Sequence, residues 1–129
     1  MKIDLTSVFV DDQAKALRFY TEVLGFVKKV DIPAVRWITV VSPEDPDGTQ
    51  VLLEPNENPA ARAYQEAIYS QGIPATSFGV DDIRGECERL VKAGVTFIVK
   101  PTETTGALIA VFDDTCGNLI QLHQVTAGP

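Results

Sequence analysis

Apolar and polar residues alternate along several short stretches of the chain, and this period of two predicts β-strands. Two other stretches carry apolar residues three or four positions apart, a spacing that predicts helices. A third helical spacing, over about 60–70, predicts a linker helix that begins near Pro59 and ends before Gly72. The predicted strands are 3–10, 27–32, 35–42, 50–54, 76–80, 95–99, 108–112 and 119–125. The two apolar helix faces consist of Ala16, Leu17, Tyr20, Val23 and Leu24, and of Ile83, Cys87, Leu90 and Val91.

Three short motifs recur along the chain at an interval of 69 or 70 residues. They stand at the start of a predicted helix, at the end of that helix and before the last strand that follows it. The pairs are Val10-Asp11-Asp12 with Val80-Asp81-Asp82, Leu24-Gly25-Phe26 with Ala93-Gly94-Val95, and Gly48 with Gly117. A constant interval across three landmarks indicates an internal duplication. Module one then covers about 1–57, the linker helix about 58–72 and module two about 73–129.

Each module reads as strand, helix and three strands, which predicts an α+β fold. Asp12 is a suitable N-cap for the first helix, because its carboxylate can accept from the free N–H groups of the first turn. Gly25 suits the C-terminal end of that helix. One helix is expected to cover one face of each module's sheet. We therefore predict a single domain of two tandem βαβββ modules, forming a cupped eight-stranded mixed sheet with helices on its outer face and a ligand pocket inside.

The charge balance excludes some classes of partner. The chain has 129 residues with 11 Lys and Arg against 18 Asp and Glu, a formal net charge of -7. This acidic excess repels phosphate groups, so neither nucleic acid nor an anionic membrane is expected as a partner. No apolar run approaches the roughly 18 residues that a membrane span requires, and the N-terminus lacks the features of a signal peptide. We expect a cytoplasmic protein.

The two cysteines, Cys87 and Cys116, lack the spacing of a metal site. Nothing in the sequence indicates an oxidising compartment, so two reduced thiols are expected. Cys116 stands in a turn-like stretch and is expected to be accessible, but no neighbouring base marks it as a nucleophile.

Several of these motifs, in this order and spacing, resemble the vicinal oxygen chelate superfamily of glyoxalases, bleomycin resistance proteins and extradiol dioxygenases. The resemblance covers nearly the whole chain. It rests on the repeated motifs above, on Phe19-Tyr20 and on the stretch from Phe112-Asp113-Asp114 to Gly117-Asn118-Leu119-Ile120-Gln121-Leu122. It implies paired βαβββ modules, frequent homodimers and, in the enzymes, a divalent metal held by residues of the first and last strand of each module.

The positions that correspond to these metal ligands are Leu5, Leu52, Ala75 and Gln121. Leucine and alanine offer no lone pair to a cation, so a divalent ion would give up its hydration for a single amide. The resemblance therefore predicts a member of the superfamily without the familial metal site. A divalent metal stays the alternative.

A polar quartet stands two residues further along the same strand faces: Ser7, Glu54, Ser77 and His123. A displaced metal site would find only two good ligands there, Glu54 and His123, fewer than the usual three or four. Glu54 as a general base with His123 as its partner is the catalytic interpretation of the quartet. A water-exposed strand end is the alternative for both residues.

The sequence therefore leaves two hypotheses for function. The first is a small-molecule binding protein of the bleomycin resistance type. The second is a lyase, isomerase or dioxygenase acting on a small substrate, with a thiol conjugate as one candidate, through Glu54 and His123 or through a displaced metal. Trp37 and Phe9 offer flat apolar walls to a planar ligand, or else belong to the core. The predicted ligand-binding residues are Leu5, Ser7, Phe9, Trp37, Leu52, Ser77, Phe78 and Gln121.

Overall fold

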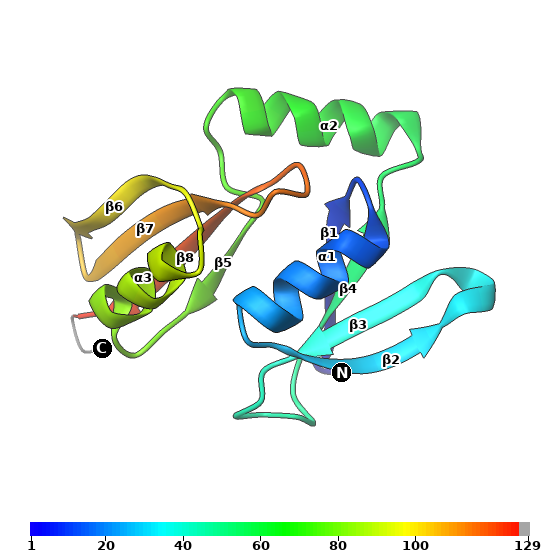
Figure 1. Ribbon diagram of the computed structural model, residues 1–129, viewed down its shortest axis with the longest axis horizontal. Coiled ribbons are helices and arrows are strands. Elements are labelled where there is room, and N and C mark those ends of the chain that lie inside the picture. The colour runs from blue at the N-terminus through cyan, green and yellow to red at the C-terminus, as the bar shows by residue number, and fades with distance from the viewer. Residues whose placement is uncertain (127–129) are drawn as a thin grey trace. The chain divides into compact units, whose positions relative to one another are not determined.

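A computed structural model describes residues 1–126 and contains eight β-strands and three α-helices (Figure 1). The eight strands form two four-stranded sheets of identical order, β1-β4-β3-β2 and β5-β8-β7-β6. The predicted α+β fold with two tandem βαβββ modules is therefore confirmed, and hydrogen bonding divides the strands into two sheets of four. Contacts within the chain define two compact units, the first containing residues 1–66 and 115–117 and the second containing 67–114 and 118–126.

The first unit begins with β1 and its capped helix. Asp12 accepts a hydrogen bond from Lys15 N at 3.0 Å, so the predicted N-cap is confirmed. The predicted helix over 12–24 changes character after Arg18: Leu24 N bonds to Phe19 O, five residues back, in a π-helical turn. The elements are β1 (Leu5–Val10), α1 (Gln13–Arg18), η1 (Phe19–Val23), β2 (Val27–Ile32), η2 (Pro33–Val35), β3 (Trp37–Val41) and β4 (Gln50–Pro55).

The second unit repeats this plan without the π-helical turn. Asp82 accepts from Gly85 N at 3.2 Å and so caps α3 as Asp12 caps α1. Gly94 has φ +93° and Gly25 has φ +92°, the left-handed conformation expected where each helix ends. The elements are β5 (Thr76–Gly79), α3 (Ile83–Lys92), β6 (Phe97–Thr104), β7 (Ala107–Asp113) and β8 (Leu119–Val125). The predicted linker helix is α2 (Pro59–Ser70).

Register decides which residues of the first sheet share a face. Ser7 pairs with Leu52 in the parallel β1–β4 ladder, and Thr39 pairs with Leu52 in the antiparallel β3–β4 ladder. Alternate strand residues point the same way, so Val8 and Leu53 lie on the other face, where they are buried on the side of α1. The face opposite α1 carries Leu5, Ser7, Phe9, Trp37, Leu52 and Glu54.

The second sheet has the same arrangement. Ser77 pairs with Gln121 and Gly79 pairs with His123 in the parallel β5–β8 ladder. These four residues occupy the face opposite α3. Phe78 alternates with them and pairs with Leu122 on the α3 side, so the prediction that Phe78 lines the same pocket as Ser77 and Gln121 is corrected.

Other predictions need smaller corrections. Val35 belongs to a 3₁₀ turn, and Arg36 has φ +52°, so the third strand starts two residues later than expected. β6 continues to Thr104, past Pro101, because it is an edge strand with a register shift between Val99 and Thr102. Cys116 is fully buried, contrary to the expected accessibility.

No helix among residues 1–126 combines the length and the apolar character needed to cross a membrane.

Candidate functional site

Three polar side chains form a hydrogen-bonded cluster on the face of the second sheet opposite α3. Ser77 Oγ lies 2.6 Å from His123 Nδ1, and Gln121 Nε2 donates to Ser77 Oγ at 3.0 Å. All three residues are half-buried. β5 and β8 position them, because parallel pairing sets Ser77 directly beside Gln121 and one step from His123. We call Ser77, Gln121 and His123 the polar cluster.

The hydrogen bonds of the polar cluster fix the orientation of the imidazole. Ser77 Oγ accepts from Gln121 Nε2, and it can either donate to His123 Nδ1 or accept from it, because a hydroxyl oxygen has one proton and two lone pairs. The contact engages Nδ1, and Nε2 is the ring nitrogen that faces Gly79. The polar cluster therefore offers an oriented imidazole, with the ring held in place by the serine hydroxyl.

Gly79 leaves space beside Nε2 of His123. A Cβ atom added at Gly79 would stand 3.3 Å from His123 Nε2, so any larger residue there would crowd the nitrogen. A cavity of about 310 Å³ lies at this end of β5 and β8. Its volume is near the lower end of the range typical of small-molecule sites, about 300–1,000 Å³. The residues that line it are Gly79, Val80, Asp81, His123, Gln124 and Val125.

The first unit carries the apolar residues that the sequence predicted for a ligand surface. Leu5 and Ser7 are exposed, Phe9 and Trp37 are half-buried, and Leu52 is buried. All five share the face opposite α1, as the predicted register requires. Their contact with a ligand stays a prediction.

Glu54 and His123 belong to different units, and both are half-buried. His123 has Ser77 as a hydrogen-bond partner, and Glu54 pairs through its strand with Phe9. The proposed acid–base pair of Glu54 and His123 therefore stays a prediction.

The residues at the familial metal positions do not suit a divalent cation. Leu52 and Gln121 occupy equivalent places in the two sheets, since each pairs with the serine of its own first strand. Leu5 and Ala75 are the corresponding first-strand positions. Three of these four side chains are hydrocarbons, and the amide of Gln121 already donates to Ser77. Within residues 1–126, His, Cys, Asp and Glu side chains do not gather in groups of three that could hold a metal ion.

The family model described as Glyoxalase/Bleomycin resistance protein/Dioxygenase superfamily matches residues 2–122. The chain belongs to this superfamily. A superfamily relative, the uncharacterized protein YurT of Bacillus subtilis (strain 168), is 62% identical and covers 96% of this chain and 99% of its own. Among solved structures, UcmS2 is 30% identical with a TM-score of 0.80, covering 95% of this chain and 97% of its own. TnmS3, an antibiotic binding protein from Streptomyces sp. CB03234, is 30% identical with a TM-score of 0.78, covering 98% and 97%.

Gly79 and Asp81 line the cavity of this superfamily member but are not among the residues predicted from the sequence. Glycine inside a strand often marks a close approach of another group, and Gly79 stands directly before the repeated Val80-Asp81-Asp82 motif. The position of this glycine in the sequence could therefore have predicted a close approach at Gly79. Gln124, whose Oε1 accepts from Ile83 N at the start of α3, has no comparable sequence signal.

Proposed function

We propose that this protein binds a small organic molecule of the antibiotic type without using a metal ion. The observation that carries the proposal is the His123 imidazole, which Ser77 orients beside a cavity of about 310 Å³. A ligand hydroxyl group is a suitable partner for Nε2, because a hydroxyl can donate a hydrogen bond or accept one. Two features support the proposal: the hydrocarbon side chains at three of the four familial metal positions, and the 30% identity with an antibiotic binding protein over nearly the whole chain.

The apolar face of the first sheet enters the proposal as a separate candidate surface. Trp37 and Phe9 are half-buried aromatic residues on the face opposite α1, and such rings stack on planar ligands. Their contribution is to be tested by its own variant, Trp37→Ala, independently of the polar cluster.

A thermal shift screen of the full chain against planar antibiotics and thiol adducts tests the proposal. A ligand at about 100 times its Kd adds about 2.7 kcal/mol to the stability of the native state. For a chain of this size, that raises the melting temperature by about 10 °C. His123→Phe keeps an aromatic ring without the two ring nitrogens, and Ser77→Ala releases Nδ1. We expect both variants to bind the hit at least about tenfold more weakly, a loss of about 1.4 kcal/mol.

Ser42→Ala, at an exposed serine of the first unit, is the matched control and should bind as the wild type does. Equal affinity of His123→Phe and the wild type for every hit would remove the polar cluster from the proposal. A screen in which no compound of either class raises the melting temperature would contradict the ligand class itself.

The catalytic alternative is a lyase, isomerase or dioxygenase acting on a small substrate, with a thiol conjugate as one candidate. The observation that favours it is the orientation of His123 by Ser77, because an imidazole held in one position is suited to proton transfer. Turnover that requires added Ni, Zn, Fe or Mn and is lost to a chelator would replace the binding proposal with the metal-dependent form. Metal-independent turnover that is lost in both Glu54→Gln and His123→Phe would replace it with the acid–base form.

Homodimerisation belongs to the same proposal, as members of the superfamily frequently pair. Sedimentation of the full chain at micromolar concentration measures it directly: a mass of twice 14.0 kDa is expected, and a mass of 14.0 kDa would contradict it.

A further inference from the structure

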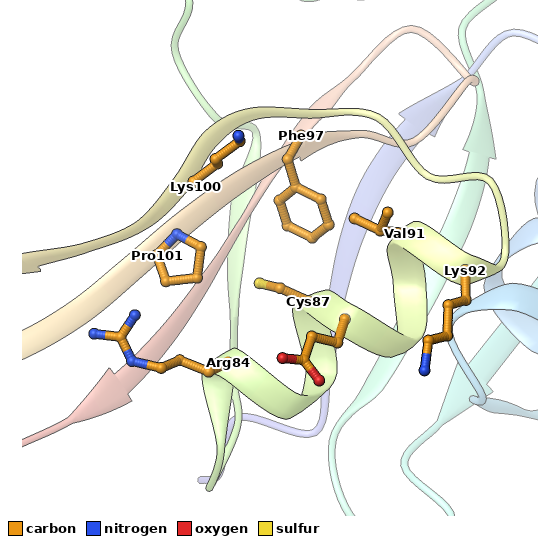
Figure 2. Close-up of a pocket in the computed structure, with 8 residues that line it drawn as sticks. Arg84, Cys87, Val91, Lys92, Phe97, Lys100 and Pro101 are labelled. Carbon is orange, nitrogen blue, oxygen red and sulfur yellow. The ribbon is translucent and has the colours of Figure 1, made fainter.

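A second hollow lies in the second unit, on the opposite side of the sheet from the polar cluster. It occupies the groove between α3 and the edge strand β6 and has a volume of about 460 Å³. Figure 2 shows Cys87, Val91, Phe97 and Pro101 around its centre, contributed by both elements. We call this hollow the α3–β6 groove.

The irregularity of β6 shapes the α3–β6 groove. The pairing of β6 with β7 shifts register between Val99 and Thr102, and the intervening Lys100 and Pro101 line the groove. Such bulges redirect side chains at sheet edges. On the helix side, Val91 was predicted to belong to the buried stripe of α3, but it is 57% exposed and faces the groove.

The charges around this apolar centre have one predominant sign. Arg84, Lys92 and Lys100 line the groove, against one carboxylate, Glu88. Within residues 1–126, the salt bridges engage five of the 11 Lys and Arg residues, and none of these three is among them. Half of the six remaining cations therefore gather at one groove of a chain whose net charge is -7.

We propose that the α3–β6 groove binds a small amphipathic anion, with an apolar body over Val91 and Phe97 and a carboxylate-like head among the cations. Three arginine or lysine side chains against one carboxylate create a net positive field that attracts an anionic head. Phe97, Val91 and Pro101 supply the apolar surface that removes a hydrocarbon or aromatic body from water. The volume lies within the range of about 300–1,000 Å³ typical of such sites. This inference is independent of the function proposed above.

An NMR titration of the isotope-labelled full chain with decanoate tests the proposal. Decanol and decyltrimethylammonium are the matched probes, because they carry the same chain with no charge or with the opposite charge. We expect saturable shifts of amides in 84–92 and 97–102 with decanoate, and at least about tenfold weaker binding of the other two probes. Rising salt should weaken decanoate binding and leave decanol unchanged.

Two charge reversals, Lys92→Glu and Lys100→Glu, should together weaken decanoate binding by about tenfold or more. Arg62→Glu is the matched control for one reversal, because Arg62 is an exposed cation of the first unit that forms no salt bridge within residues 1–126. Val91→Thr keeps the shape but lowers the apolar character, and should weaken decanoate and decanol alike. Circular dichroism establishes that each variant is folded.

The proposal is overturned if decanoate gives no saturable shifts in the groove, if the three probes bind equally well, or if Arg62→Glu weakens binding as much as Lys100→Glu does. Co-sedimentation with phosphatidylglycerol vesicles distinguishes a free ligand from a membrane surface. Vesicle binding stronger than decanoate binding would also overturn the proposal of a free amphipathic anion.

Discussion

Gln65 is a polar side chain of α2 that we expect to be essential to the stability of the first unit. It is 3% exposed. Its Nε2 donates to Phe9 O at 3.0 Å and to Cys116 O at 3.2 Å, and its Oε1 accepts from Asn56 Nδ2 at 2.8 Å. A single amide therefore connects β1, the turn after β4 and the loop 115–117. The test is Gln65→Leu, which keeps the approximate volume and removes these three hydrogen bonds.

The magnitude follows from these contacts. Each hydrogen bond contributes about 0.5–1.5 kcal/mol net, and a buried group left without a partner costs more. Cys116 O retains a second donor, Asp11 N at 3.1 Å, which moderates the loss at that carbonyl. We therefore expect Gln65→Leu to lower the free energy of unfolding by about 2–4 kcal/mol. Urea unfolding of the full chain, followed by circular dichroism and by Trp37 fluorescence, measures this change.

The matched control is Gln71→Leu, the same substitution at an exposed position, which should change stability by less than about 0.5 kcal/mol. A double-mutant cycle with Asn56→Ala should show a coupling of about 0.5–1.5 kcal/mol, since the two side chains share one hydrogen bond. Stability of Gln65→Leu within about 0.5 kcal/mol of wild type would refute this reasoning, and additive effects in the cycle would refute the coupling.

Three further predictions concern backbone strain, pH and thiol reactivity. Gly117→Ala should destabilise the protein more than Gly25→Ala. Both glycines have positive φ, but only at Gly117 would a Cβ stand 2.7 Å from Gln65 Nε2. Equal melting temperatures of the two variants in thermal unfolding would contradict this prediction. Hydrogen bonding to Lys15 N lowers the pKa of Asp12 below 3.8, so the ionised carboxylate caps α1 and stabilises the fold above that pH. This stabilisation is lost as the pH falls through the lowered pKa. Asp12→Asn should therefore lose less stability than the wild type on acidification, which acid titration followed by circular dichroism can establish. Burial, with a smaller contribution from Glu86, raises the pKa of Cys87, and Cys116 is fully buried. Both thiols should therefore resist iodoacetamide in the native protein and react with it in urea. Rapid labelling of the native protein, measured by mass spectrometry, would contradict this prediction.

The repeat and the helix ends were predictable from sequence because their signals are local. Asp12 and Gly25 act through their own backbone neighbours, and the interval of 69 or 70 residues carries the same signals into the second module. Strand alternation then gave the faces of Leu5 and Leu52, and it brought Ser77 and His123 to matching steps of their strands.

The remaining features depend on contacts that periodicity does not encode. Phe78 was grouped with its strand neighbour Ser77, although adjacent strand residues point to opposite faces. Val91 fits the spacing of the buried helix stripe, yet it lies beside the irregular part of β6 and stays exposed. Pro101 suggested the end of a strand, but an edge strand tolerates proline where no neighbour needs its N–H.

The loop 115–117 belongs to the first unit, although the strands on either side of it, β7 and β8, belong to the second. A gene fragment that ends at the linker would therefore encode an incomplete half, without the carbonyl that receives the amides of Gln65 and Asp11. Two such fragments, expressed together, should complement one another, whereas either alone should be prone to aggregation. Selection on one copy of the duplication therefore also acts on the other copy. The two halves are expected to have lost the ability to evolve or recombine as separate genes.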